Sequence, residues 1–224
     1  MENLVEKAST NQIKIGTILG YVALLISILY GLIITPWIIE TIGEGAFGIY
    51  TLSNSIISMF LLDFGLSTTT NVFLSKYKAN NDLEGEQKFL GVIFKLYFII
   101  SIVIFLIFLI LFFVADYIYV GLTLEERADL KICLLITGLF SVVSFPFTPF
   151  LGILKANEKF IFVKNVEIIN KILLIGLTII SIECGFGLYG LVAVHAIVGL
   201  ISVALRIIFC VFSNSPYLLT ISSL

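Results

Sequence analysis

The chain has 224 residues, of which 59% are hydrophobic and 12% charged, and its mean hydropathy is +1.14. Soluble domains carry roughly 25% charged residues, so this composition excludes an ordinary soluble domain and points to an integral membrane protein. The net charge of −2 offers no basic surface to a nucleic acid, and three scattered cysteines and one histidine form no disulfide framework or zinc motif. We therefore expect no nucleic-acid partner, no metal and no cofactor.

Six apolar segments follow one another along the chain, and each is long enough to cross a ~30 Å hydrocarbon core as a helix. The runs are continuous and do not alternate with a period of two, so they do not fit the strands of a barrel. We predict an all-α, polytopic membrane protein with transmembrane helices at residues 15–39, 46–71, 89–115, 132–154, 160–182 and 188–212. Residues 1–14 form a cytoplasmic segment in this prediction, 15–212 a six-helix lobe, and 213–224 a tail at which the chain looks truncated.

Lysine and arginine predict the orientation, because cytoplasmic loops are enriched in them. Eleven of the thirteen basic side chains fall on one predicted side, and only Arg127 and Lys131 fall on the other. Both termini are therefore predicted to be cytoplasmic. The eleven are Lys7, Lys14, Lys76, Lys78, Lys88, Lys95, Lys155, Lys159, Lys164, Lys171 and Arg206.

The fifth segment, 160–182, carries the most informative charge. Lys171 lies roughly 16 Å into it, near the membrane midplane, and a charge at that depth usually faces protein or a wet cavity. Glu167 precedes Lys171 by one turn, in the order that favours an ion pair along a helix, and Asn170 lies beside it. Two interpretations remain open: a polar stripe that lines a cavity, or an ion pair packed between helices.

The second segment carries another polar stripe, in which Asp63 and Asn71 share a helical face. Asp63 could bind a proton or cation, pair with a base, or be solvated at the inner interface. Lys95 and Arg206 lie a turn or two inside the cytoplasmic boundary, where each alone would extend to the lipid headgroups. Together with Lys171 they could instead form a basic lining suited to an anionic headgroup.

Prolines and small residues predict how the spans bend and pack. Pro146 and Pro149 should kink the fourth span and Pro36 the first, because proline has no amide donor. Glycines in the first and sixth spans allow close helix contact. For His195 in the sixth span, a hydrogen-bonded packing role is favoured over a proton relay. The chain has no nucleophile elbow, no H-E-x-x-H and no P-loop, so we do not expect an enzyme.

Two stretches of sequence carry a family resemblance. GEGAFGIYTL at 43–52 follows Thr35-Pro36-Trp37 and precedes LDFGL at 62–66 and a basic Lys76-Tyr77-Lys78, and PFLGILKANEKF occupies 149–160. This order resembles the polysaccharide transporter family, the Wzx-like flippases of the multidrug/oligosaccharidyl-lipid/polysaccharide exporter superfamily. The resemblance implies the N-terminal lobe of a two-lobed protein in the bacterial inner membrane. It also implies transport of undecaprenyl-pyrophosphate-linked oligosaccharide to the outer leaflet during cell-surface polysaccharide biosynthesis.

We choose the candidate site residues by their predicted depth in the membrane and by the helical face on which they lie. Lys171, Lys95 and Arg206 are the candidates for binding the substrate phosphate, and Asp63 is the candidate for cation coupling or for pairing. Glu167, Asn170 and Asn71 are expected to line the cavity. We expect a second lobe or a second copy as partner, because a bulky lipid-linked sugar needs a cavity between two moving bodies. The alternative is an inactive remnant lobe, or a six-helix scaffold in a polysaccharide biosynthesis complex.

Overall fold

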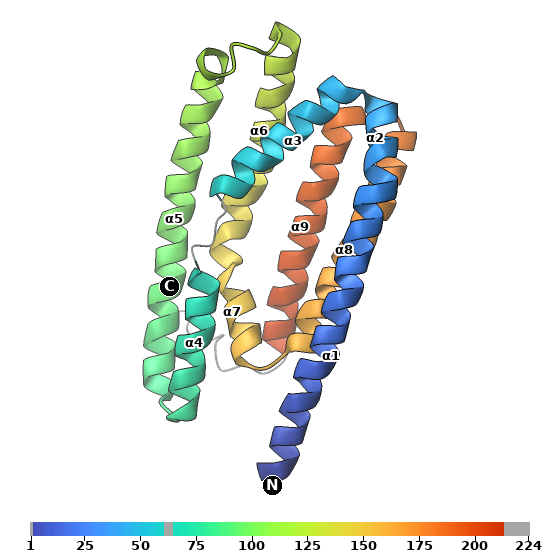
Figure 1. Cartoon of the computed structure of the whole chain (residues 1–224). Helices are drawn as coiled ribbons and strands as arrows, with labels where there is room; N and C mark the ends of the chain where they lie inside the picture. Colours follow the sequence, from blue (N-terminus) through green and yellow to red (C-terminus); the bar gives the residue numbers. More distant parts are fainter. Residues whose placement is uncertain (1, 61–64, 213–224) are drawn as a thin grey trace.

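The computed structural model describes the backbone of residues 2–60 and 65–212, and the side chains from Asn11 onward within these ranges, apart from residues 57, 59 and 60. Every regular element over these residues is helical (Figure 1). In chain order the elements are α1 (Glu2–Leu29), η1 (Tyr30–Ile34), α2 (Thr35–Ile42), α3 (Glu44–Phe60), α4 (Leu66–Ala79), α5 (Leu83–Ile118), α6 (Leu124–Ser144), η2 (Phe145–Phe147), α7 (Pro149–Ala156), α8 (Phe160–Glu183) and α9 (Gly187–Phe212).

Five helical stretches of the described chain are long and apolar enough to cross a membrane. They are Asn11–Ile42, Leu83–Ile118, Leu124–Ala156, Phe160–Glu183 and Gly187–Phe212. They correspond to five of the six predicted segments, and they confirm the prediction of a helical, polytopic membrane protein. The number six is not confirmed.

The remaining predicted span, 46–71, is not one uninterrupted helix. α3 ends at Phe60, and α4 begins at Leu66 after Gly65, whose φ of 77° is left-handed. Glycine adopts this conformation without the penalty of a Cβ atom, so Gly65 can turn the chain into α4. α3 and α4 nevertheless follow each other from the upper to the lower end of the molecule (Figure 1).

The predicted kinks are present as changes of helix type. A π-helical turn, Tyr30–Ile34, directly precedes the first turn of α2, which contains Pro36. α6 gives way at Ser144 to the 3₁₀ turn Phe145–Phe147, which contains Pro146, and Pro149 opens α7. The missing proline amides explain why the α-helical hydrogen-bond ladder stops there.

The helices pack as a chain of neighbours. α1 packs on α8, α8 on α9, α9 on α6, and α6 on α3 and α5, whereas α4 packs on α7. The main core lies between α3, α5, α6 and α9, where Tyr97, Leu130 and Leu191 have no exposed surface. A second cluster, near the lower end, joins α4, α5 and α7 around Leu90 and Ile153.

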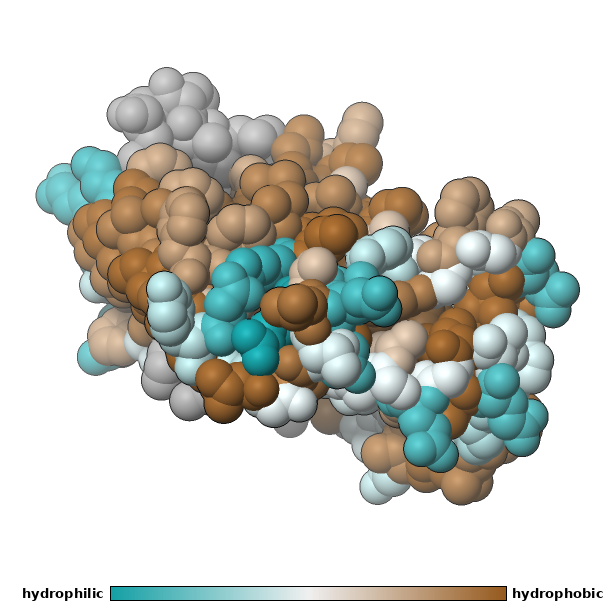
Figure 2. Space-filling model, turned by 90° about the horizontal axis from the view of Figure 1, so that it is seen from above, coloured by the Kyte–Doolittle hydropathy of each residue, from teal (hydrophilic) through white to brown (hydrophobic). Residues whose placement is uncertain are grey.

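Large apolar side chains cover the outer flanks of the molecule. Leu32 in η1 is 70% exposed and Phe113 in α5 is 66% exposed, and long rows of similar residues accompany them. Exposed apolar surface of this extent requires an apolar surrounding. Figure 2 shows the upper end, where the α2–α3, α5–α6 and α8–α9 connections lie and hydrophilic side chains gather among the apolar ones.

Candidate functional site

Four helices form an open groove that holds a cluster of charged side chains, which we call the α1–α8 groove. It has a volume of ≈ 940 Å³ and is formed by α1, α7, α8 and the last turns of α9. Charged and amide side chains from three of these helices line it: Lys155 of α7, Lys164, Glu167, Asn170 and Lys171 of α8, and Arg206 of α9. The sequence had predicted four of these six as site residues, from two spans.

The spacing of α8 explains why its polar residues share the groove. Positions three, four and seven apart lie on one face of a helix, and Lys164, Glu167 and Lys171 follow this spacing. The facing residue of α1 is Gly20, where a Cβ atom would lie 3.6 Å from the Lys164 side chain. This is an ordinary van der Waals distance, so Gly20 lies directly against the lysine side chain across the groove.

The one carboxylate of the groove is paired with Lys164. The Lys164 ammonium donates to Glu167 at 2.7 Å, and both side chains are more than one third exposed. Lys171, which the sequence had placed beside Glu167, donates instead to the Ser27 hydroxyl of α1. Ser27 and Lys171 border a recess of ≈ 400 Å³ that adjoins the groove and shares Lys164 and Glu167 with it.

Arg206 brings an unused donor into the groove. Its Nε atom is buried and has no hydrogen-bond partner within the described chain, and the same holds for Oδ1 of Asn170. A buried polar atom without a partner costs about 1–3 kcal/mol. A ligand that accepts hydrogen bonds from arginine would remove part of this cost.

Two of the other predicted residues lie elsewhere, which corrects the proposed basic lining. Lys95 is exposed on α5 and borders an apolar groove that α7 and α9 separate from the α1–α8 groove. Asn71 is half-buried on α4 and lines neither groove. Depth along a span gives the position of Lys95 along its helix but not the direction in which it faces. Asp63 lies outside the described residues.

His195 has the hydrogen-bonded packing role that the sequence favoured. Its Nε2 atom lies 3.0 Å from the Tyr50 hydroxyl, and its Nδ1 atom lies 3.1 Å from the Leu191 carbonyl. If Nδ1 carries the proton and donates to Leu191, Nε2 accepts from Tyr50. The ring thus connects α3 to α9.

Sequence reasoning missed two groups of polar contacts. Ser27 lies seven residues after Gly20 on α1, so the helical period of the first span could have indicated it. At the lower end, Lys78 of α4 donates to Asn157, which follows α7, across 79 residues of sequence, and Glu86 of α5 is only 3% exposed. Burial lowers the pKa of Lys78, and the nearby Glu86 carboxylate acts in the opposite direction. No local sequence motif indicates this contact.

No family model, no curated protein and no solved structure matches the chain. Over the described ranges, no three His, Cys, Asp or Glu side chains come together in a group that could hold a metal ion. The charges of the α1–α8 groove are therefore the indication of what it binds.

Proposed function

We propose that the chain is one lobe of a membrane transporter for lipid-linked oligosaccharide, and that the α1–α8 groove binds the pyrophosphate group of the carrier lipid. The observation that carries this proposal is the excess of positive charge in the groove. Lys155, Lys164, Lys171 and Arg206 line it, and Glu167 is the only acidic side chain among the described residues of the lining.

An anionic ligand follows from this charge balance. Placing a cation at membrane depth costs about 2.5–3.5 kcal/mol on insertion scales, so unpaired cations there mark ligand or ion pathways. Glu167 forms its ion pair with Lys164 and also acts electrostatically on Arg206, so one carboxylate faces four cations in the described lining. Arginine binds phosphate through two parallel hydrogen bonds, and lysine binds it as a point charge. A pyrophosphate group suits this pair.

The substrate class rests on the family resemblance together with this groove. Carrier lipids for cell-surface polysaccharides join an isoprenyl tail in the bilayer to a pyrophosphate at its surface, and the groove joins apolar and cationic surfaces in the same way. The lysines of the groove are half-exposed, which leaves surface for a second unit to cover. Transporters built from repeats bind substrate at the interface between two moving units. In this proposal a second lobe or a second copy covers the groove, and the protein works in the bacterial inner membrane.

Complementation of a flippase-deficient strain tests the proposal. The chain is expressed with a separately encoded C-terminal lobe, and surface polysaccharide and protein abundance are measured. Loss of a charge-assisted hydrogen bond costs about 1.5–3 kcal/mol, so Lys171→Ala and Arg206→Ala should each reduce polysaccharide at least tenfold while the protein remains in the membrane.

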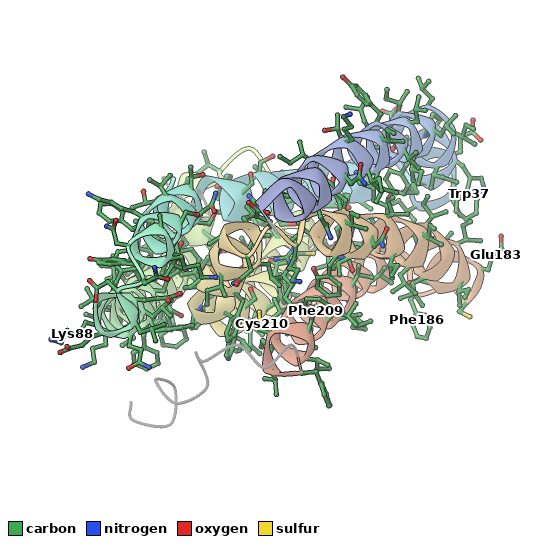
Figure 3. The ribbon with its side chains drawn as sticks, turned by 90° about the horizontal axis from the view of Figure 1, so that it is seen from below. Trp37, Lys88, Glu183, Phe186, Phe209 and Cys210 are labelled. Carbon is green, nitrogen blue, oxygen red and sulfur yellow. The ribbon has the colours of Figure 1, made fainter. Side chains whose placement is uncertain are left out.

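The matched control is Lys88→Ala. Lys88 lies in the first turns of α5, points away from the bundle (Figure 3) and forms an exposed pair with Glu84 at 2.6 Å. This variant should retain wild-type output. Wild-type polysaccharide output from both groove variants would refute the pyrophosphate site. If the chain restores no surface polysaccharide with any C-terminal lobe, the scaffold alternative is favoured.

A further inference from the structure

A second groove, on the other side of α7 and α9, is apolar and open to the lipid. It has a volume of ≈ 1090 Å³ and lies between α5, α6, η2, α7 and α9; we call it the α5–α7 groove. Five phenylalanines contribute to its walls: Phe94, Phe98 and Phe105 of α5, and Phe147 and Phe150 of η2 and α7. Among the described residues of its lining, Lys95 alone is charged.

A hydrogen bond at the proline break holds α5 and α6 together beside this groove. The Val142 carbonyl would ordinarily accept from the amide of residue 146, but Pro146 has no amide donor. The Ser101 hydroxyl of α5 donates to that carbonyl at 2.7 Å instead. This bond connects α5 to α6 at the point where the 3₁₀ turn begins, so the break and the groove beside it are held by a direct contact.

The length of the groove matches one leaflet of a bilayer. Its lining on α5 runs from Phe94 to Phe105, which is about 16 Å at 1.5 Å per helical residue. Half of a ~30 Å hydrocarbon core is about 15 Å. Lys95 lies near the end of this stretch that faces the lower end of α5, a turn or two inside the predicted boundary, from where its side chain can extend to the headgroups. The phenylalanines line the rest of the stretch, at the depth of the acyl chains.

We infer that the α5–α7 groove binds an anionic diacyl phospholipid, with an acyl chain between the phenylalanines and the phosphate on Lys95. The lysine is exposed, and no hydrogen bond or ion pair joins it to another described residue. Its charge therefore selects an anionic headgroup over a zwitterionic one. The one-leaflet length fits a phospholipid acyl chain, whereas an undecaprenyl chain is far longer than the groove.

This inference does not rest on the proposed transport function, since the two grooves share no lining residue. Native mass spectrometry of the purified full chain tests it, with equimolar phosphatidylglycerol and phosphatidylcholine as probes. We expect phosphatidylglycerol to be retained about fivefold over phosphatidylcholine, the factor that one lysine near an anionic surface contributes. Lys95→Ala and Lys95→Gln should reduce this ratio to about one.

Two further variants separate charge from shape. Lys88 lies two turns before Lys95 on the same helix and outside the groove, so Lys88→Ala should keep the fivefold preference. Val143→Trp should fill the groove and lower retention of both lipids severalfold without loss of the monodisperse protein. Equal retention of both lipids by the wild type, an unchanged preference in Lys95→Ala, or displacement of phosphatidylglycerol by equimolar undecaprenyl phosphate would each overturn the inference.

Discussion

At the scale of single residues, two arginines have opposite environments. Arg127, near the upper end, donates from its Nε and terminal nitrogens to the carbonyls of Leu122, Val120 and Asp116, at 2.8–3.3 Å. It thereby satisfies carbonyls at and beyond the C-terminus of α5, where a helix lacks internal partners. Arg206 has a buried Nε atom without a hydrogen-bond partner among the described residues. The first arginine is used by the fold, and the second is available to a ligand.

This difference predicts the outcome of removing Arg127. Arg127→Ala leaves the carbonyls of the α5–α6 connection without a charged donor, and we expect a loss of about 1.5–3 kcal/mol of unfolding free energy. Thermal unfolding of the purified protein in detergent measures the loss. Lys88→Ala removes only an exposed ion pair and should change stability by less than about 1 kcal/mol. Equal stabilities of the two variants would contradict the capping role.

At the scale of helices, the sequence predicted where the spans and their breaks lie along the chain better than it predicted which helices pack together. Hydropathy located five spans, and the prolines located the breaks at Pro36 and Pro146. The break at Gly65 was missed because the sequence around it stays apolar, and a single left-handed glycine cannot be recognised from hydropathy. Lys95 was grouped with Arg206 because depth fixes a position along a helix, whereas the facing partner depends on which helices pack together.

The contact between α4 and α7 gives a prediction at this scale. At Gly152 of α7, a Cβ atom would lie 2.8 Å from Thr70 Cβ and 2.9 Å from the Ser67 carbonyl oxygen. Gly152→Ala should therefore force the two helices apart and cost about 1–3 kcal/mol. Gly176 of α8 has no atom within 4 Å of the equivalent position, so Gly176→Ala should be neutral or stabilising. Detergent melting curves compare the two, and a stable Gly152→Ala protein would argue against the close packing.

At the scale of the whole molecule, the basic residues divide between two ends. The last turns of α4 and α7 carry Lys76, Lys78 and Lys155 at the lower end, whereas Arg127 and Lys131 flank the α5–α6 connection at the upper end. The predicted orientation places the lower end in the cytoplasm. Cys184 follows α8 at the upper end and is exposed, while Cys133 and Cys210 are buried.

A native cysteine therefore tests the orientation. A membrane-impermeant maleimide should label Cys184 from outside intact cells, and Cys184→Ser should remove the label. With Asn80→Cys added to Cys184→Ser, labelling should appear only after the cells are permeabilised, because Asn80 follows α4 at the lower end. Labelling of Asn80→Cys in intact cells would reverse the orientation.

In the proposed function, the α1–α8 groove, and not the α5–α7 groove, holds pyrophosphate. The most direct measurement is the affinity of the purified chain for undecaprenyl pyrophosphate, by native mass spectrometry over a concentration series. Arg206→Ala and Lys171→Ala should each weaken binding at least tenfold, since each removes a charge-assisted contact of about 1.5–3 kcal/mol. Lys95→Ala should bind like the wild type, because Lys95 lies outside the groove. Wild-type affinity in Arg206→Ala and Lys171→Ala, or a tenfold loss in Lys95→Ala alone, would contradict the claim.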